Sequence, residues 1–321
     1  MRQLLLILSC LCWQQPLYCW GFYAHRVINE YAVYLLPPEM LALYLPMVGY
    51  LREHATDADK RRYIVKVEAP RHYIDMDHYG SYPYPELPRR WQDAVEKYSI
   101  DSLYAHGIVP WRILEVQRSL TEAFQQKNAR AILKLSADLG HYIGDAHVPL
   151  HTSSNHNGQK TNQHGIHGFW ESRLPELYAE KEWDFLMDKA GYIRKPADRV
   201  WRIVLESAQA VDSVLGIEAR LTARTPADQK FAYEWRNQQL LRQYSTLFSA
   251  SYNKALNGMV ERRMREAIHT VASFWYTAWV NAGQPRLTGL ANGLGTEMDG
   301  VLDSLDLQWK NAHTNGRICE D

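Results

Sequence analysis

Two histidine–acid pairs with helical spacing constrain the fold more than any other feature of this sequence. The segment GHYIGDAHVPLH carries His141 and Asp145 four positions apart, and the later segment HGFWE carries His167 and Glu171 at the same separation. Side chains four residues apart lie on one face of an α-helix, so each pair presents an imidazole and a carboxylate together. Both groups are ligands of Zn²⁺, and His151 lies between the two pairs in the sequence. The spacing therefore predicts a zinc-binding pocket built on helices.

The first pair has an alternative interpretation. The apolar stripe of its predicted helix, which ends near Pro149, consists of Ile132, Leu135, Leu139 and Ile143. His141 and Asp145 point roughly away from this stripe, as a pair that faces water would. However, Gly140 and Gly144 flank the pair, and each glycine costs a helix about 1 kcal/mol relative to alanine. Two glycines at these positions are explained if another group must approach the helix backbone closely.

The rest of the chain also shows helical periodicity. HRVINEYAVYLLPPEM has helical spacing up to Pro37-Pro38, and two helices are predicted from Trp111 to about Leu150, with a break near Lys127-Asn128. MVERRMREAIHTVASFWYTAWV carries an apolar stripe that we interpret as packed core, formed by Val260, Met264, Ala267, Val271, Phe274 and Ala278. Neither an internal repeat nor an alternating strand pattern is evident. We therefore expect an all-α fold, a single-domain bundle of several helices.

Charge excludes one kind of binding. Lys plus Arg and Asp plus Glu both number 36, which gives a formal net charge of zero. The chain therefore lacks the basic excess of proteins that bind nucleic acid or anionic membranes non-specifically. A small site for a nucleotide or a lipid headgroup remains compatible with this balance, and no obligate protein partner is inferred.

The first residues have the pattern of a secretory signal peptide. Arg2 precedes the apolar run LLLILSCLCW, which is too short to span a bilayer. Cleavage after Cys19 would make Trp20 the new amino terminus, and a lipoprotein-like cut before Cys10 in ILSC is the alternative. We expect a signal peptide over residues 1–19, a single folded domain over 20–284 and a tail over 285–321, in a secreted or periplasmic protein. Cys10, Cys12 and Cys19 would be lost, so the remaining Cys319 could form no intrachain disulfide.

Together with WGFYAH, ADKRRY and HYID upstream, these motifs make the chain resemble the superfamily of zinc-dependent phospholipases C and single-strand-specific zinc nucleases, over about residues 20–280. The resemblance implies an α-helical fold with three zinc ions in one cleft. The first zinc ion would be bound by Asp59, His72, His141 and Asp145, the second by His151, His167 and Glu171, and the third by the amine and carbonyl of Trp20 with His25 and a shared Asp145. Asp57 competes with Asp59, which we prefer because ADKRR matches the family's Ala-Asp-x-x-Arg pattern.

Zinc would support hydrolysis of a phosphate ester, because Zn²⁺ lowers the pKa of bound water from 15.7 to about 7. We expect Asp59 to accept the proton of the attacking water, and Arg62 to clamp a phosphate oxygen through its planar guanidinium. The alternative for Arg62 is a solvated surface side chain among Lys60 and Arg61. A non-catalytic zinc protein is a further alternative, but a purely structural zinc site is closed by four protein ligands, and the second and third sites have fewer or shared ones.

The substrate is either single-stranded nucleic acid or phospholipid. The nuclease branch has an aromatic residue after the metal-binding histidine and an aspartate two positions further, and here Tyr73 and Asp75 fill these positions to stack on a base and hydrogen-bond to it. Glu171 and the short loop before His167 instead resemble the phospholipases. The prolines and aromatics of SYPYPELPRRW, which include Tyr82, Tyr84 and Trp91, either form an apolar rim or pack onto the domain. We favour a nuclease, and leave His54, His78, His147, His156 and His164 without a role.

Overall fold

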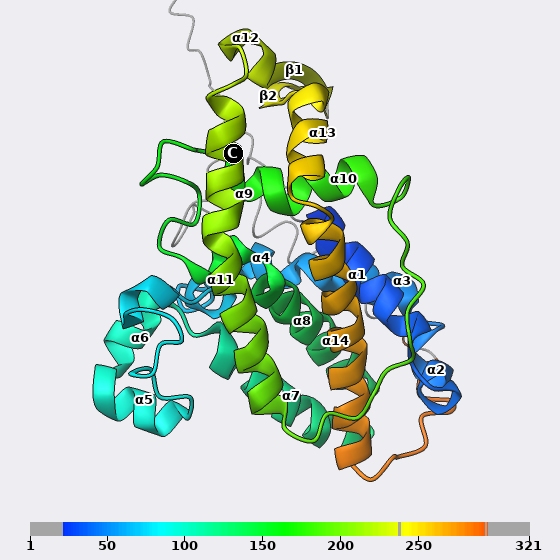
Figure 1. Ribbon diagram of the computed structural model, residues 1–321. Coiled ribbons are helices and arrows are strands. Elements are labelled where there is room, and N and C mark those ends of the chain that lie inside the picture. Colours follow the sequence, from blue (N-terminus) through cyan, green and yellow to red (C-terminus); the bar gives the residue numbers. More distant parts are fainter. Residues whose placement is uncertain (1–21, 237–238, 293, 295–321) are drawn as a thin grey trace, which may run out of the picture.

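The computed structural model describes residues 22–236, 239–292 and 294. Within these ranges the protein consists of helices and loops apart from one β-hairpin (Figure 1), so the predicted helical fold is confirmed. Trp20, the predicted signal peptide with its three cysteines, and Cys319 lie outside the described residues. The cleavage site, the domain limits and the absence of a disulfide therefore stay predictions.

The first part of the chain supplies most of the helices that surround the site. They are α1 (Phe22–Tyr34), α2 (Pro38–Tyr44), α3 (Val48–Glu53), α4 (Asp57–Arg62), α5 (Trp91–Tyr98), α6 (Ile100–His106), α7 (Val109–Gln125) and α8 (Ala129–His147). Short 3₁₀ turns connect them, namely η1 (His54–Thr56), η2 (Ala69–His72), η3 (Met76–Tyr79) and η4 (Pro149–Thr152).

The second part begins with a short helical segment and ends with long helices. Its elements are α9 (Ile166–Gly168), the π-helical turn η5 (Phe169–Arg173), α10 (Leu174–Tyr178), α11 (Pro196–Thr222), α12 (Ala227–Lys230), β1 (Phe231–Arg236), β2 (Gln239–Tyr244), α13 (Thr246–Ala255) and α14 (Met259–Asn281). The predicted apolar stripe of α14 is buried. None of the helices in the described ranges is long and apolar enough to cross a membrane.

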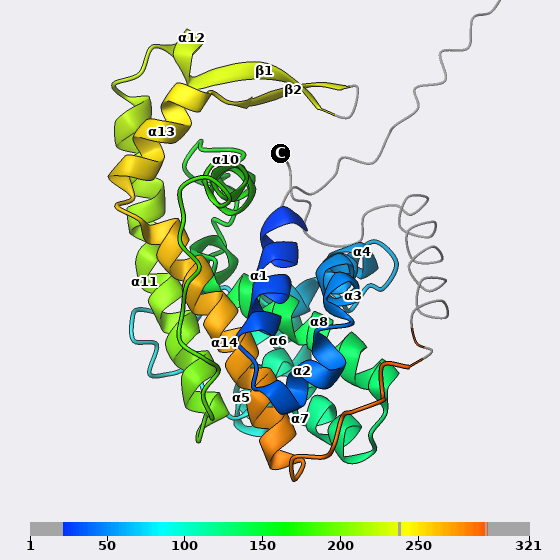
Figure 2. The same cartoon turned by 90° about the vertical axis from the view of Figure 1, so that its right-hand side faces the viewer.

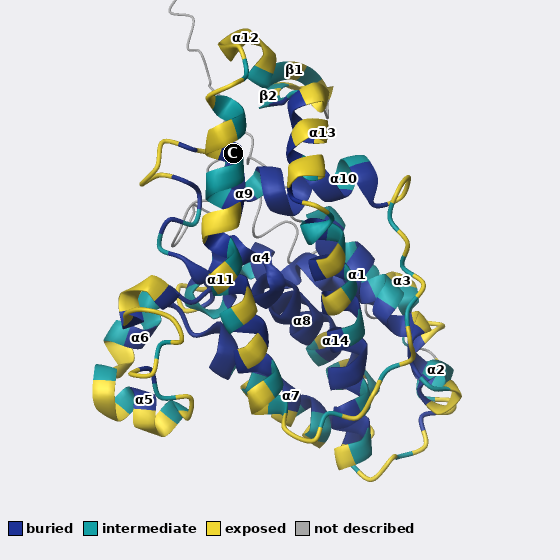
Figure 3. Ribbon diagram, in the orientation of Figure 1, coloured by how far each residue is buried: buried dark blue, intermediate teal, exposed yellow. Residues whose placement is uncertain are grey.

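Helix α8 lies at the centre of the bundle. It packs against α7, α14, α1 and α11, and Figure 3 shows most of its ribbon in the colour of buried residues. Every residue from Ser136 to His147 is buried. The interpretation in which His141 and Asp145 face water is therefore wrong, because neighbouring elements cover the polar face of this helix as well as its apolar stripe. The predicted break before α8 is present, where the side chain of Asn128 accepts a hydrogen bond from the Ala131 amide at 3.1 Å.

Helix α1 lies directly against the polar face of α8, and two glycines make this approach possible. A Cβ atom added at Gly140 would lie 1.8 Å from Asn29 Oδ1, and one at Gly144 would lie 2.9 Å from His25 Nδ1. Asn29 is fully buried and donates to the carbonyls of Leu51 at 3.3 Å and Ala137 at 3.2 Å. The glycines therefore admit α1, which brings His25 into the centre of the bundle.

The expectation that the chain contains no strands is wrong for one segment. Strands β1 and β2 pair antiparallel, with Phe231 opposite Tyr244 and Trp235 opposite Leu240. Phe231, Tyr233 and Trp235 alternate with smaller or charged residues, a period of two that is typical of a strand. Figure 2 shows the hairpin projecting from the end of the α11–α13 pair, beyond α10.

The base of the hairpin packs against the segment that carries His167 and Glu171. The ring of Tyr244 stacks on Phe169 with the centroids 3.8 Å apart. Arg173 forms a bidentate pair with Glu234, at 2.9 and 2.5 Å. The hairpin therefore supports the α9–η5 segment.

The contact between α1 and α8 gives a test of the packing argument. Gly140→Ala should lower the free energy of unfolding by about 1–3 kcal/mol, because the added methyl group overpacks the contact with Asn29. Gly49→Ala in α3 is the matched control, since a Cβ there meets nothing within 4 Å; it should be neutral or stabilising by up to about 1 kcal/mol. Urea denaturation measures both changes, and equal effects of the two variants would contradict the argument.

Candidate metal centre

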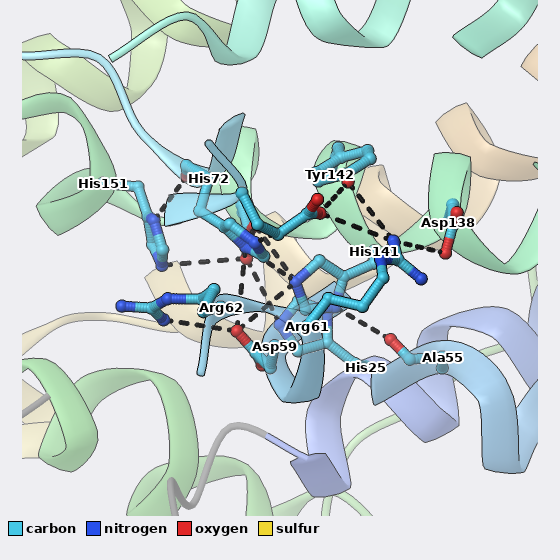
Figure 4. Close-up of polar contacts among 12 residues, drawn as sticks. His25, Ala55, Asp59, Arg61, Arg62, His72, Asp138, His141, Tyr142 and His151 are labelled. Carbon is cyan, nitrogen blue, oxygen red and sulfur yellow. Dashed lines mark hydrogen bonds and ion pairs between the residues drawn. The ribbon is translucent and has the colours of Figure 1, made fainter. Parts of the chain in front are cut away.

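Eight of the predicted ligand side chains lie on seven different elements of the described chain. They are His25 on α1, Asp59 on α4, His72 on η2, His141 and Asp145 on α8, His151 on η4, His167 on α9 and Glu171 on η5. All eight are buried. Figure 4 shows His25, Asp59, His72, His141 and His151 pointing toward a common centre. Each side chain offers a nitrogen or oxygen atom there, and these atoms form three groups that could each hold one metal ion.

The first group contains Asp59, His72 and His141, whose ligand atoms all lie within 4.8 Å of one another. His72 Nδ1 lies 3.7 Å from Asp59 Oδ1 and 3.0 Å from His141 Nε2. Asp145 joins this group, because its Oδ2 lies 2.9 Å from His72 Nδ1 and 3.3 Å from His141 Nε2. These four residues are the ones that the resemblance implies for the first zinc ion.

The second group contains His151, His167 and Glu171. Glu171 Oε2 lies 2.7 Å from His167 Nε2 and 3.4 Å from His151 Nε2. The backbone between His167 and Glu171 enters the π-helical turn η5 rather than continuing as a regular α-helix. Such turns often occur at functional sites.

The third group contains His25, His141 and Asp145. The rings of His25 and His141 stack with their centroids 4.0 Å apart. His25 Nε2 lies 3.3 Å from Asp145 Oδ1 and also 3.3 Å from Glu171 Oε1. Asp145 is therefore shared between two groups, as the resemblance implies, and Glu171 connects the second group to the third. Trp20, the remaining predicted ligand, lies outside the described residues.

Three of the imidazoles are oriented by backbone carbonyls. His141 Nδ1 donates to the carbonyl of Ala55 at 2.8 Å, and His151 Nδ1 donates to the carbonyl of His72 at 2.6 Å. His167 Nδ1 donates to the carbonyl of His156 at 3.2 Å. Because each Nδ1 carries the proton, each Nε2 is left with a lone pair that faces the cluster. A neutral imidazole in this tautomer is a metal ligand.

The carboxyl groups of the cluster are held in their ionised form. Burial opposes ionisation, but the surrounding histidines outweigh it and lower the pKa of Asp59, Asp145 and Glu171. Burial also opposes protonation of His25, yet the carboxylates of Asp145 and Glu171 raise the pKa of this histidine well above its ordinary value. Several anionic groups in a buried place require compensating positive charge. Divalent cations would supply it, and the mixture of imidazole and carboxylate suits zinc.

The structure distinguishes between Asp57 and Asp59, the two candidate ligands of the first zinc ion. Asp59 faces His72 and His141, whereas Asp57 Oδ2 lies 2.5 Å from His54 Nδ1 and its Oδ1 lies 3.5 Å from Lys60 Nζ. The geometry therefore favours Asp59 over Asp57 as a ligand. It also gives His54 a position in a local pair with Asp57, outside the three groups.

Of the predicted catalytic and substrate-binding residues, Arg62 contacts a ligand of the first group, and Tyr73 and Asp75 follow another of its ligands in the sequence. Arg62 Nη1 is 3.3 Å from Asp59 Oδ1, and the Arg62 side chain is only 13% exposed, so the interpretation as a solvated surface residue is wrong. Tyr73 follows His72 directly and Asp75 lies two positions further on, and both are buried. The Asp75 amide donates to the His106 carbonyl at 2.7 Å, and Asp75 Oδ2 lies 3.5 Å from His106 Nδ1.

The other histidines have separate environments. His147 is buried, and its Nδ1 donates to the Ile143 carbonyl at 2.7 Å. Burial and the charge of Arg263 lower the pKa of His147 well below its ordinary value. The rings of His78 and His106 stack with their centroids 3.3 Å apart. His156 supplies the carbonyl that accepts from His167, and His164 lines a cavity of about 270 Å³ between the hairpin and the α9–η5 segment. None of these five belongs to the three groups.

A buried network beside His72 was not predicted. Glu68 lies one helical turn before His72 and is 1% exposed. Burial opposes its ionisation, but Arg61, His72, Tyr142 and Arg71 lower the pKa of Glu68 to about 2. The separation of four residues between Glu68 and His72 is the same signal that identified the pairs of α8 and HGFWE, and it would have found this residue.

The S1/P1 Nuclease family matches residues 20–274. The chain belongs to the S1/P1 nuclease family. The resemblance to the superfamily of zinc nucleases and phospholipases C is thereby confirmed, and the family supports a nuclease-type hydrolase of phosphodiester bonds. No curated protein matches the sequence.

The second group offers a test of metal binding with a matched pair of histidines. His167→Ala should lower the zinc content by about one ion per chain, because only two protein ligands would remain in that group. His164→Ala should leave the zinc content unchanged, since His164 is three positions away in the sequence and lies outside the group. Metal analysis of the purified proteins measures both, and an unchanged zinc content in His167→Ala would count against the assignment.

Proposed function

We propose that this protein is an exported zinc-dependent nuclease that hydrolyses phosphodiester bonds of single-stranded nucleic acid. The observation that carries the proposal is the convergence of three imidazole–carboxylate groups from seven elements, in a chain that belongs to the S1/P1 nuclease family. The second group has three side-chain ligands among the described residues, and the third shares His141 with the first. A closed structural zinc site has four protein ligands, so the second and third groups favour catalysis.

The residues fit three zinc ions. Asp59, His72, His141 and Asp145 would hold the first, His151, His167 and Glu171 the second, and His25 with Asp145 and the amine and carbonyl of Trp20 the third. When bound, zinc ions lower the pKa of water into the neutral range and stabilise the charge of phosphate oxygens. Glu171 Oε1 is as close to His25 Nε2 as Asp145 Oδ1 is, at 3.3 Å. Glu171 would therefore be available to help hold the third ion as well as the second.

Asp59 and Arg62 act together on the phosphate. The ionised carboxylate of Asp59 accepts the proton of the attacking water, and the lowered pKa of this carboxyl keeps it ionised at neutral pH. Arg62 binds a phosphate oxygen through its guanidinium, which the Asp59 carboxylate orients at 3.3 Å. Both residues belong to α4, so one short helix would supply the proton acceptor and the phosphate clamp.

Tyr73 and Asp75 bind the base of the nucleotide whose phosphate is cleaved. A base inside a duplex cannot reach them, because it must be unstacked to lie against an aromatic ring. This requirement gives the preference for single strands. Glu171 is the feature shared with phospholipases. In the proline-rich loop Tyr84 and Trp91 pack against the core, and Tyr82 is the one exposed residue of these three aromatics. This loop therefore does not form a continuous aromatic rim for a membrane.

The leader sequence supports export, and the family match begins at Trp20. If cleavage follows Cys19, the mature protein should begin at Trp20 and contain about three zinc ions per chain. Amino-terminal sequencing and metal analysis of the exported protein measure this. Assays on single-stranded DNA, RNA and phosphatidylcholine should then show zinc-dependent cleavage of the nucleic acids. Cleavage of phosphatidylcholine alone would identify a phospholipase, and a zinc-loaded protein that cleaves none of the three would have structural zinc.

Base stacking is tested at Tyr73. Tyr73→Ala should lower kcat/KM on short single-stranded oligonucleotides by about 5- to 150-fold, because stacking on an aromatic ring contributes about 1–3 kcal/mol. The zinc content should stay that of the wild type. Tyr73→Phe retains the ring and is the control; it should retain most of the activity. Unchanged oligonucleotide kinetics in Tyr73→Ala would show that the ring has no part in binding the base.

A further inference from the structure

His72 differs from His141, His151 and His167 in the partner of its outer ring nitrogen, the one that points away from the cluster. His141, His151 and His167 direct Nδ1 to backbone carbonyls and Nε2 to the cluster. His72 directs Nδ1 to the cluster, 2.9 Å from Asp145 Oδ2. Its Nε2 lies 3.8 Å from Glu68 Oε1 and makes no hydrogen bond within the described residues. His72 is thus the one of these four whose outer nitrogen faces a carboxylate.

Glu68 is itself held firmly in place. Its Oε2 accepts from Arg71 Nη1 at 2.6 Å, and its Oε1 accepts from Arg61 Nη2 at 3.4 Å and from the hydroxyl of Tyr142. Arg61 is anchored by Asp138, at 2.9 Å. Figure 4 shows Arg61, Asp138 and Tyr142 grouped on the side of the cluster away from His151.

The residues that hold Glu68 come from the same elements as the first group of ligands. Arg61 belongs to α4, two positions after Asp59, and Tyr142 directly follows His141 on α8. The carboxylate is therefore fixed relative to the ligands rather than to a distant surface. A shift of roughly 0.6 Å or more would bring the 3.8 Å separation from His72 into direct hydrogen-bond range.

We propose that Glu68 is a positioning residue of the first metal site, which acts through the ring of His72. The carboxylate holds the His72 proton at Nε2, so that Nδ1 keeps a lone pair directed at the ion, and it fixes the plane of the ring. Carboxylates in this role make a metal-binding imidazole a stronger ligand. The inference rests on the proposed function only in that His72 binds a zinc ion.

The test compares zinc affinity in two variants of the buried network. Glu68→Gln preserves shape and removes the charge that faces His72. It should weaken the binding of one zinc ion by about 10- to 100-fold and leave the other ions unaffected. Asp138→Asn is the matched control, because it removes another buried carboxylate of the network that does not face His72; its zinc affinity should stay close to that of the wild type. Competition against a chromophoric chelator measures the affinities, and thermal unfolding of the loaded proteins checks their fold.

A second measurement needs no variant. In the zinc-loaded wild-type protein, ¹⁵N NMR of the imidazoles should show that His72 binds metal through Nδ1 and carries its proton at Nε2. A metal-bound or unprotonated Nε2 would overturn the proposal even if Glu68→Gln failed to fold. Equal losses of affinity in Glu68→Gln and Asp138→Asn would also overturn it, since they would indicate a loss of packing alone.

The outcomes separate this inference from the proposed function. A protein that binds zinc with the predicted dependence on Glu68 but cleaves no phosphodiester supports the inference and contradicts the nuclease. A nuclease whose zinc affinity is unchanged in Glu68→Gln contradicts only the inference. A wild-type protein that binds no zinc overturns both.

Discussion

The carboxylate of Asp145 is the group on which the rest of the structure depends. It is 1% exposed and lies within 3.7 Å of ring nitrogens of His25, His72, His141 and His151. A buried anion is costly unless it is paired, so the elements that carry these histidines must all reach the C-terminal end of α8. The central position of α8, the turns η2 and η4 at its sides, and the approach of α1 all satisfy this requirement.

The approach of α1 shows how backbone packing sets the geometry of the site. An ordinary residue at Gly140 or Gly144 would meet Asn29 or His25, and α1 would have to move away from α8. The stacking of His25 on His141 at 4.0 Å would then be lost. The two glycines thus contribute to the site without offering a ligand atom, because they determine how close two ligand-bearing helices lie.

The sequence predicted the local parts of this arrangement better than the parts that depend on distant contacts. The proximity of His141 to Asp145 follows from α-helix geometry alone, and the break before α8 follows from Lys127-Asn128. His167 and Glu171 also come together as their spacing predicted, although a π-helical turn replaces the expected regular helix. His25, Asp59 and His72 have no local relation to these pairs, and only the family resemblance connected them. The burial of the polar face of α8 could not be read from its apolar stripe, because it depends on which helix packs there. The hairpin has an alternation of large and small or charged side chains, and Glu68 lies four residues before His72. Both features were therefore predictable from the sequence, although neither was predicted.

The β-hairpin has a consequence for any attempt to shorten this protein. By its position it resembles a dispensable appendage, since it projects beyond the bundle (Figure 2). Yet Tyr244 and Glu234 brace Phe169 and Arg173, which flank Glu171 in the π-helical turn. Removing these strands would remove the contacts that hold the π-helical turn, which could then relax toward a regular α-helix. The hairpin therefore supports the position of Glu171 in the metal centre from outside the helical bundle.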